Sequence, residues 1–279
     1  MATETTSSTI SELYTEIVAE ALFVASEQSI MRNLVRNYTI AGGGKSVEVP
    51  IYANVSASAV NEATDLSNTA VNPTSVTITA SEVGIMTTLT DLARNSASRN
   101  VAGDIGRLFG EAIARKIDAD LSALFTGFST ERAGGAGNEL TVADVFEAVA
   151  DLRTANAPAP YYGVFHPKQI FNVKKSLTNT FVGRDTELSN EAMRTGFVGT
   201  IAGVQIFESS NISVDGSDDS IGGVFSQDAL ALAMMQDLKI ESQRDASLRA
   251  DEIVATAVYG VSEIHDSYGV KLTADTLAN

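Results

Sequence analysis

Hydrophobic residues recur at three- and four-residue spacing in two long segments of the chain. Residues 10–36 follow a Ser/Thr-rich start that favours a helix cap, and their periodic apolar positions predict a helix. Residues 101–125 carry one apolar stripe with most charged residues off it, which predicts an amphipathic helix of about 25 residues, roughly 38 Å long. Gly127 provides a stop just beyond that helix.

Between these two helical segments, residues 46–90 have the composition of β-strands. Residues 46–57 and 74–93 are rich in β-branched side chains with partial alternation, and they flank a polar tract at 56–73. The pattern predicts a long two-stranded arm with a polar tip. Such a ribbon buries little surface by itself, so we expect it to have a partner, either another part of the chain or another subunit.

From residue 139 onward, helical and strand patterns alternate. Thr141 is the expected N-cap of a helix that Pro158 stops, and Asp144 lies near its positive end. A short buried strand in 161–167 and a helix in 168–177 follow. Residues 199–207 and 222–235 are interpreted as glycine turns paired with short strands. The chain ends in strand-like segments with a glycine turn at Gly269, and the whole pattern predicts an α+β fold.

Composition narrows the range of functions. The 279 residues are 44% hydrophobic and contain no cysteine, which excludes a disulfide framework, a thiolate nucleophile and cysteine-ligated metal. No long apolar run and no signal-like N-terminus is present, so the chain is expected to be soluble and cytoplasmic. Its 35 acidic and 19 basic residues give a net charge of -16, which disfavours nucleic-acid and acidic-membrane surfaces as partners. The acidic excess serves either solubility or avoidance of polyanions.

Two histidines are the first candidates for chemistry. His166 stands where a strand passes into a helix, immediately before Pro167, and is interpreted as a residue that bonds the backbone at a helix start. A metal site would need further ligands, yet His265 lies in a different segment beside Asp266. No GxSxG elbow or Ser–acid pattern near His166 makes it a general base.

Acidic residues are the other candidates. Asp118 and Asp120 are two residues apart on the predicted long helix and point in different directions, so they are expected to form a solvated or subunit-facing edge. Asp215, Asp218 and Asp219 lie in an acidic loop without the spacing of a calcium-binding loop, and a solvated loop is expected there. The sequence therefore predicts no catalytic, cofactor-binding or metal-binding residues, and no enzyme activity.

The order of these parts resembles the major capsid proteins of tailed double-stranded DNA bacteriophages, which have the Hong Kong 97-type fold. The phrases that are similar to the family are "VFHPKQIFNVKKSL", "GTIAGVQIFESSNI", "FSQDALALA" and "YGVSEIHDSYGVKL". The resemblance implies an N-terminal arm at 1–40, an E-loop β-arm at 41–90 and a peripheral domain with a spine helix at 91–138. It further implies an axial domain at 139–258 and a return to the peripheral domain at 259–279.

The resemblance implies a structural subunit that assembles as pentamers and hexamers into an icosahedral head enclosing DNA. The implied partners are further copies of the chain, a scaffolding protein, a portal and a possible decoration protein, with assembly in the host cytoplasm and residence in the virion. Some members join subunits through an isopeptide bond from a lysine on the E-loop tip, but residues 56–73 contain no lysine and Lys45 is the arm's only one. A non-covalent shell is therefore expected. An encapsulin-like nanocompartment shell and a soluble α/β enzyme remain the alternatives.

Overall fold

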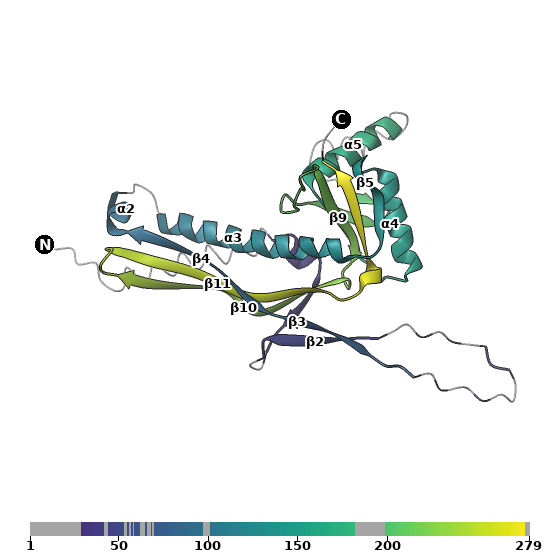
Figure 1. The fold of residues 1–279 in the computed structure, drawn as a ribbon, viewed down its shortest axis with the longest axis horizontal. Helices are drawn as coiled ribbons and strands as arrows, with labels where there is room; N and C mark the ends of the chain where they lie inside the picture. The colour runs from purple at the N-terminus through teal and green to yellow at the C-terminus, as the bar shows by residue number, and fades with distance from the viewer. Residues whose placement is uncertain are drawn as a thin grey trace.

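The chain folds into a long sheet backed by a helix, a second and more compact sheet, and a thin ribbon that projects away from both (Figure 1). The structure is a computed structural model. It describes residues 29–41, 44–52, 70–96, 101–181 and 199–276, together with residues 55, 57, 59–61, 65 and 68 of the arm.

The long sheet has four strands in the order β1-β10-β11-β4. Helix α3 and the short 3-10 helix η2 lie along one face of this sheet (Figure 1). The elements of this part are η1 (Met31–Asn33), β1 (Arg36–Thr39), β4 (Ser81–Thr90), α2 (Asp91–Ser96), α3 (Val101–Ala123), η2 (Leu124–Gly127), β10 (Leu230–Asp245) and β11 (Ala250–Glu263).

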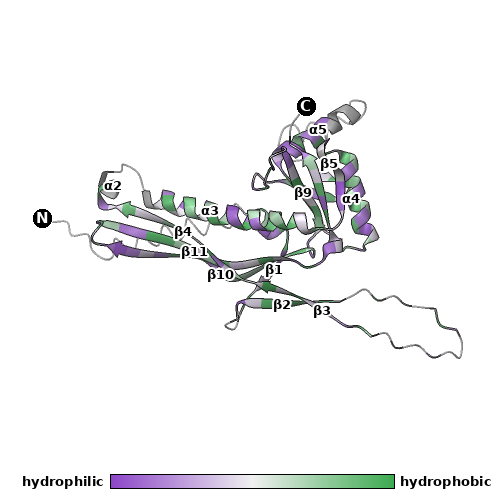
Figure 2. Ribbon diagram, in the orientation of Figure 1, coloured by the Kyte–Doolittle hydropathy of each residue, from purple (hydrophilic) through white to green (hydrophobic). Residues whose placement is uncertain are grey.

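Both faces of the long sheet are buried near the start of β10. Leu230 and Leu232 belong to the core that α3 completes, whereas Ala231 and Ala233 belong to a separate core on the opposite face. Successive residues of a strand point to opposite faces, so the repeating Ala-Leu pattern supplies one side chain to each core in turn. Figure 2 shows the hydrophilic residues of β10 gathering at its other end, toward the turn into β11.

The compact sheet has six strands in the order β5-β12-β9-β6-β8-β7. Helices α4 and α5 pack against it around a second core that includes Leu152, Phe165 and Ile170. The elements of this part are β5 (Glu131–Glu139), α4 (Val142–Thr154), β6 (Tyr161–Phe165), α5 (Pro167–Phe181), β7 (Thr200–Ile201), β8 (Val204–Glu208), β9 (Asp219–Ser226), η3 (Asp266–Tyr268) and β12 (Gly269–Asp275). The predicted helix beginning after Thr141, the buried strand and the helix that follows it are confirmed.

Gly222 and Gly223 lie inside β9, so the prediction of a glycine turn at this point is wrong. A Cβ atom on Gly222 would lie 2.3 Å from the ring of Phe165, and one on Gly223 would lie 2.8 Å from the ring of Phe125. Aromatic rings from both faces therefore occupy the space that side chains would take. These glycines allow close packing on the two faces of one strand instead of a chain reversal.

The ribbon consists of β2 (Ser46–Ile51) and β3 (Thr74–Thr79), paired antiparallel. It is shorter than the predicted arm at 41–90, because β3 ends at Thr79 and the following strand β4 pairs with β11 in the long sheet. The backbone N–H of Ala80 donates to the carbonyl oxygen of Lys45 at 2.8 Å, which closes the ribbon at its base.

The predicted boundaries of the C-terminal half differ from the structure. β10 and the first part of β11 fall in the proposed axial segment 139–258 but belong to the long sheet beside α3. β12 falls in the proposed return at 259–279 but belongs to the six-stranded sheet. The tight turn after β9 carries the chain from one sheet to the other, which the local pattern of strands and turns did not reveal. The predicted helix at 10–36 is wrong over its last part, where η1 is followed by strand β1, and its residues 10–28 lie outside the described residues.

Candidate functional site

The ribbon of β2 and β3 projects from the rest of the described subunit (Figure 1). At its base, Val49 and Ile78 are buried against the second face of the long sheet, together with Ala231 and Ala233. A two-stranded ribbon is marginally stable in isolation, so this packing provides the support that its own ladder lacks. The base is therefore part of the subunit's core, and the ribbon leaves it in a defined direction.

Beyond its paired residues, the arm exposes apolar side chains to solvent. Tyr52 is 62% exposed and Val55 is 61% exposed, and Val60 and Val71 are also largely exposed. No described residue of the same subunit covers them. Apolar side chains gathered along one projecting element are typical of a surface that is completed by another molecule.

Residues 29–31 are held against α3 by a buried carboxylate. Asp118 is 1% exposed, and its oxygens accept hydrogen bonds from the Ser29 hydroxyl at 2.7 Å and from the backbone N–H groups of Ile30 and Met31 at 3.1 Å each. Burial raises the pKa of Asp118, and these three hydrogen bonds act in the opposite direction. Asp118 thus fixes the position at which the N-terminal segment joins the helix.

The prediction that Asp118 lies on a solvated or subunit-facing edge is wrong, because the residue is buried within its own subunit. Asp118 falls between Ile117 and Leu121 on the buried side of α3, so helical periodicity itself contained the signal. Asp120 does lie outside the core, where it forms an ion pair with Lys116 at 2.7 Å and accepts a hydrogen bond from the Tyr259 hydroxyl at 2.7 Å.

His166 occupies the structural position that the sequence predicts. Its Nδ1 atom accepts a hydrogen bond of 3.4 Å from the backbone N–H of Lys168, in the first turn of α5. Burial, followed by the charge of Lys168, lowers the pKa of His166, which favours the neutral ring that this bond requires. His265 lies elsewhere, with its ring centroid 4.6 Å from that of Tyr268. The two histidines therefore do not form a common site.

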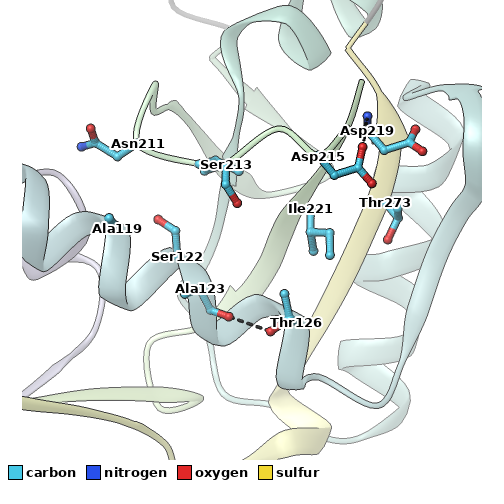
Figure 3. A pocket seen from close by; sticks show the side chains of 11 residues that line it. Ala119, Ser122, Ala123, Thr126, Asn211, Ser213, Asp215, Asp219, Ile221 and Thr273 are labelled. Atoms are coloured by element: carbon cyan, nitrogen blue, oxygen red, sulfur yellow. Dashed lines mark hydrogen bonds between the residues drawn. The ribbon is translucent and has the colours of Figure 1, made fainter. Parts of the chain in front are cut away.

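The acidic loop borders a groove of about 330 Å³ between the end of α3, the loop and the edges of β9 and β12 (Figure 3). The prediction of a simple solvated loop is wrong for Asp219, which is buried and accepts a hydrogen bond from the backbone N–H of Gly137 at 3.3 Å. Asp215 accepts hydrogen bonds from the backbone N–H groups of Ser217 and Asp219, which fold the loop on itself. These carboxylates are therefore engaged in holding the loop.

Among the described residues, no three His, Cys, Asp or Glu side chains gather as ligands for one metal ion. None of the described helices combines the length and the hydropathy that crossing a membrane requires.

Comparison with known proteins agrees with this geometry. The family described as phage capsid protein matches residues 73–271. The fold is similar to the capsid structure of the cyanophage P-SCSP1u, with 19% identity over 88% of both chains and a TM-score of 0.70. It is also similar to the capsid of Ralstonia phage GP4, with 10% identity over 88% of both chains and a TM-score of 0.71. A structure from Mycobacterium phage Che8 has 23% identity over 82% of this chain and 84% of that chain, with a TM-score of 0.66. No curated protein matches.

The long helix on its sheet, the compact second sheet and the projecting arm together make up the Hong Kong 97-type fold. The chain belongs to the phage capsid protein family, because the family match covers well over half of its length. The resemblance predicted from the sequence is confirmed, and the nanocompartment alternative is not favoured. The family match also favours a structural role over the alternative of a soluble enzyme.

Proposed function

We propose that this chain is the major capsid subunit of a tailed phage, assembling as hexamers and pentamers into an icosahedral head that encloses double-stranded DNA. The observation that carries the proposal is the arm, whose base is built into the core while its outer part exposes Tyr52, Val55, Val60 and Val71. Membership of the phage capsid protein family supports the same role.

A shell subunit needs several interfaces of moderate size, because assembly must be strong in sum and correctable at each step. A standard protein interface buries about 800 Å² on each partner, and linked contacts reinforce one another through their effective concentration. An arm that lies on a neighbouring subunit adds such an interface without enlarging the core. In this proposal, the base of the arm belongs to its own subunit and the outer part serves neighbours.

The charge of the chain fits a container for DNA that does not bind particular sequences. The net charge of -16 gives no general attraction to phosphate, so packaged DNA is not expected to adhere to the shell wall. The proposed partners are other copies of the chain, a scaffolding protein, a portal and a possible decoration protein. Assembly takes place in the host cytoplasm, and the subunits are held together without covalent links.

Negative-stain electron microscopy and analytical ultracentrifugation of the purified chain, with and without a co-expressed scaffolding protein, test the proposal. We expect closed shells, or rings of five and six subunits, in at least one of the two preparations. A persistent monomer in both would contradict it.

A further inference from the structure

Three segments that lie far apart in the sequence meet beside α3. The segment Ser29–Met31 is held on this helix by Asp118, and the loop between β8 and β9 reaches the same place from the six-stranded sheet. In that loop, Ile212 is 5% exposed and belongs to the core that α3 forms with the long sheet. Its neighbour Asn211 lines the groove along the end of α3 (Figure 3). One point on α3 therefore contacts both the N-terminal segment and a loop of the six-stranded sheet.

Neutral donors alone stabilise the buried charge of Asp118. The Ser29 hydroxyl and the backbone N–H groups of Ile30 and Met31 provide three hydrogen bonds, and the side chain of Asn211 provides a fourth and weaker one. Burial raises the pKa of Asp118 and these donors lower it, and no charged side chain among the described residues adds to either effect. A buried carboxylate without a cation depends on each of its donors, because an ionised group that loses hydrogen bonds in an apolar core is costly.

Charged side chains on the neighbouring elements are engaged elsewhere. On η1, Arg32 forms an ion pair with Asp237, with 3.3 Å between the nitrogen and oxygen atoms. On α3, Lys116 forms an ion pair with Asp120 at 2.7 Å. The charge of Asp118 is therefore supported by the N-terminal segment and the β8–β9 loop together.

Departure of the segment Ser29–Met31 from α3 removes three of the four donors. The carboxylate then remains charged in an apolar core unless water replaces the lost donors. Water reaches Asp118 only where the surrounding core opens. Residues 213–218 of the β8–β9 loop are exposed, so opening on that side disturbs the least packing. Release of the segment thus favours opening of the loop, and an open loop weakens the hold on the segment.

We propose that Asp118 couples the attachment of the segment Ser29–Met31 to the closure of the β8–β9 loop. The subunit then has a closed state with both in place, and an open state in which the segment is released and the loop is loosened. Coupling of this kind is a free energy shared between two sites, and it acts equally in both directions. A molecule that draws the segment away from α3 thereby frees the six-stranded sheet from the helix at this loop without touching the sheet. This inference concerns the subunit alone and goes beyond the proposed function.

Hydrogen exchange on the unassembled full chain tests the coupling in both directions. Ser29→Ala removes one donor, and we expect residues 209–215 to exchange roughly fivefold faster or more, although they are distant in the sequence. Two amides in that stretch are hydrogen-bonded to backbone carbonyl oxygens, so a change in protection is measurable. Conversely, Asn211→Ala should speed exchange in residues 31–35, where the backbone N–H of Leu34 donates to a carbonyl oxygen.

A serine variant elsewhere controls for a general loss of stability. Ser226 is 1% exposed, lies at the opposite end of β9 from the loop, and donates its hydroxyl hydrogen bond to the carbonyl oxygen of Pro158. Ser226→Ala therefore removes a buried hydrogen bond of the same kind, but it should leave exchange in residues 31–35 and 209–215 unchanged. Unchanged exchange of residues 209–215 in Ser29→Ala, or an equal increase in Ser226→Ala, would overturn the inference.

Asp118→Asn tests whether the coupling passes through the carboxylate. An amide has one acceptor oxygen and turns an NH₂ group toward the remaining donors, so the segment and the loop should both exchange faster. Adding Ser29→Ala to this variant should change exchange of residues 209–215 by less than about twofold, because the link is already broken. Asp120→Asn, two residues along the same helix, should alter neither the segment nor the loop. A full further effect of Ser29→Ala in the Asp118→Asn background would contradict the coupling.

The outcomes separate this inference from the proposed function, because every measurement uses the unassembled subunit. A chain that never forms shells or rings would contradict the proposed function and leave the coupling intact. Absence of coupling would overturn the inference and leave the proposed function intact. If Asp118→Asn fails to fold, the comparison of Ser29→Ala and Asn211→Ala with Ser226→Ala still decides the question.

Discussion

Adding one methyl group at Gly260 should disturb the arm through its base. A Cβ atom at this position of β11 would lie 2.4 Å from the carbonyl oxygen of Thr79 and 2.8 Å from its carbonyl carbon. A carbon and an oxygen that are not bonded normally stay about 3.3 Å apart, so Gly260→Ala forces the backbones of β3 and β11 apart by about 1 Å. The clash joins a Cβ atom fixed to the backbone of β11 and backbone atoms of β3, so no flexible side chain can move aside to absorb the shift.

The size of the effect follows from the geometry of the ribbon. Overpacking that moves backbone costs about 1–3 kcal/mol. Within the ribbon, β3 lies about 5 Å from β2. If β3 is pushed by about 1 Å while β2 acts as the pivot, the ribbon tilts by about 12°. Over the six paired residues, roughly 20 Å, that tilt moves the far end of the ribbon by about 4 Å. We therefore expect a modest loss of stability together with a severe loss of assembly.

Two matched glycine variants separate these effects. Gly216→Ala adds a methyl group where nothing lies within 4 Å, so it should change neither stability nor assembly. Gly269→Ala places its Cβ 2.1 Å from the Phe128 ring, away from the arm, so it should destabilise the subunit without tilting the ribbon. Thermal unfolding reports stability, because each kcal/mol lost lowers the unfolding midpoint by about 2–4 °C. Ultracentrifugation at low temperature reports assembly. Normal shells and an unchanged thermal unfolding midpoint for Gly260→Ala would refute the reasoning. The reasoning would also be refuted if Gly269→Ala lost as much assembly as Gly260→Ala when both variants are equally destabilised.

Three further predictions concern the core, the arm and the links between subunits. Ile113→Asp buries a carboxylate on the core side of α3, so urea unfolding should show a loss of several kcal/mol or no folded subunit. Leu108→Asp, on the exposed side of the same helix, should leave unfolding nearly unchanged. Deletion of residues 57–72 should leave a folded subunit by circular dichroism but no closed shells by electron microscopy, and normal particles would contradict the role given to the arm. Shells boiled in detergent should run as single subunits on a gel, because residues 56–73 contain no lysine, and a ladder of multimers would disprove this.

Elements with strong local signals were predicted correctly from the sequence. The apolar stripe located α3, Thr141 located the start of α4, and Pro167 after a buried strand located the start of α5. Each of these signals lies within a few residues of the element that it specifies. The structural role of His166 was predictable for the same reason, since the residue bonds a neighbour in its own helix turn.

Features that depend on distant partners were not predicted. Asp118 was assigned to a solvated or subunit-facing edge although helical periodicity placed it on the buried side of α3, because the donors that satisfy its carboxylate there, Ser29 to Met31, are almost 90 residues away in the chain. The glycines of β9 were interpreted as a turn because the rings that cover them, Phe125 and Phe165, come from other elements. The predicted boundaries placed β10 and β12 in the wrong sheets for a similar reason, since the composition of a strand does not specify which strand it pairs with.

The base of the arm and the long sheet share one hydrophobic core. The sequence alone therefore did not show where the arm ends and the sheet begins. Ala231 and Ala233 alternate with Leu230 and Leu232 because one face of β10 receives side chains from α3 while the other receives the ribbon at close range. Small side chains on the ribbon side, with Gly260 on the adjacent strand, let the ribbon approach closely. In the proposed shell each arm reaches a neighbour at a fixed angle, and an arm packed into the core of its own subunit meets that requirement better than one attached through a flexible hinge.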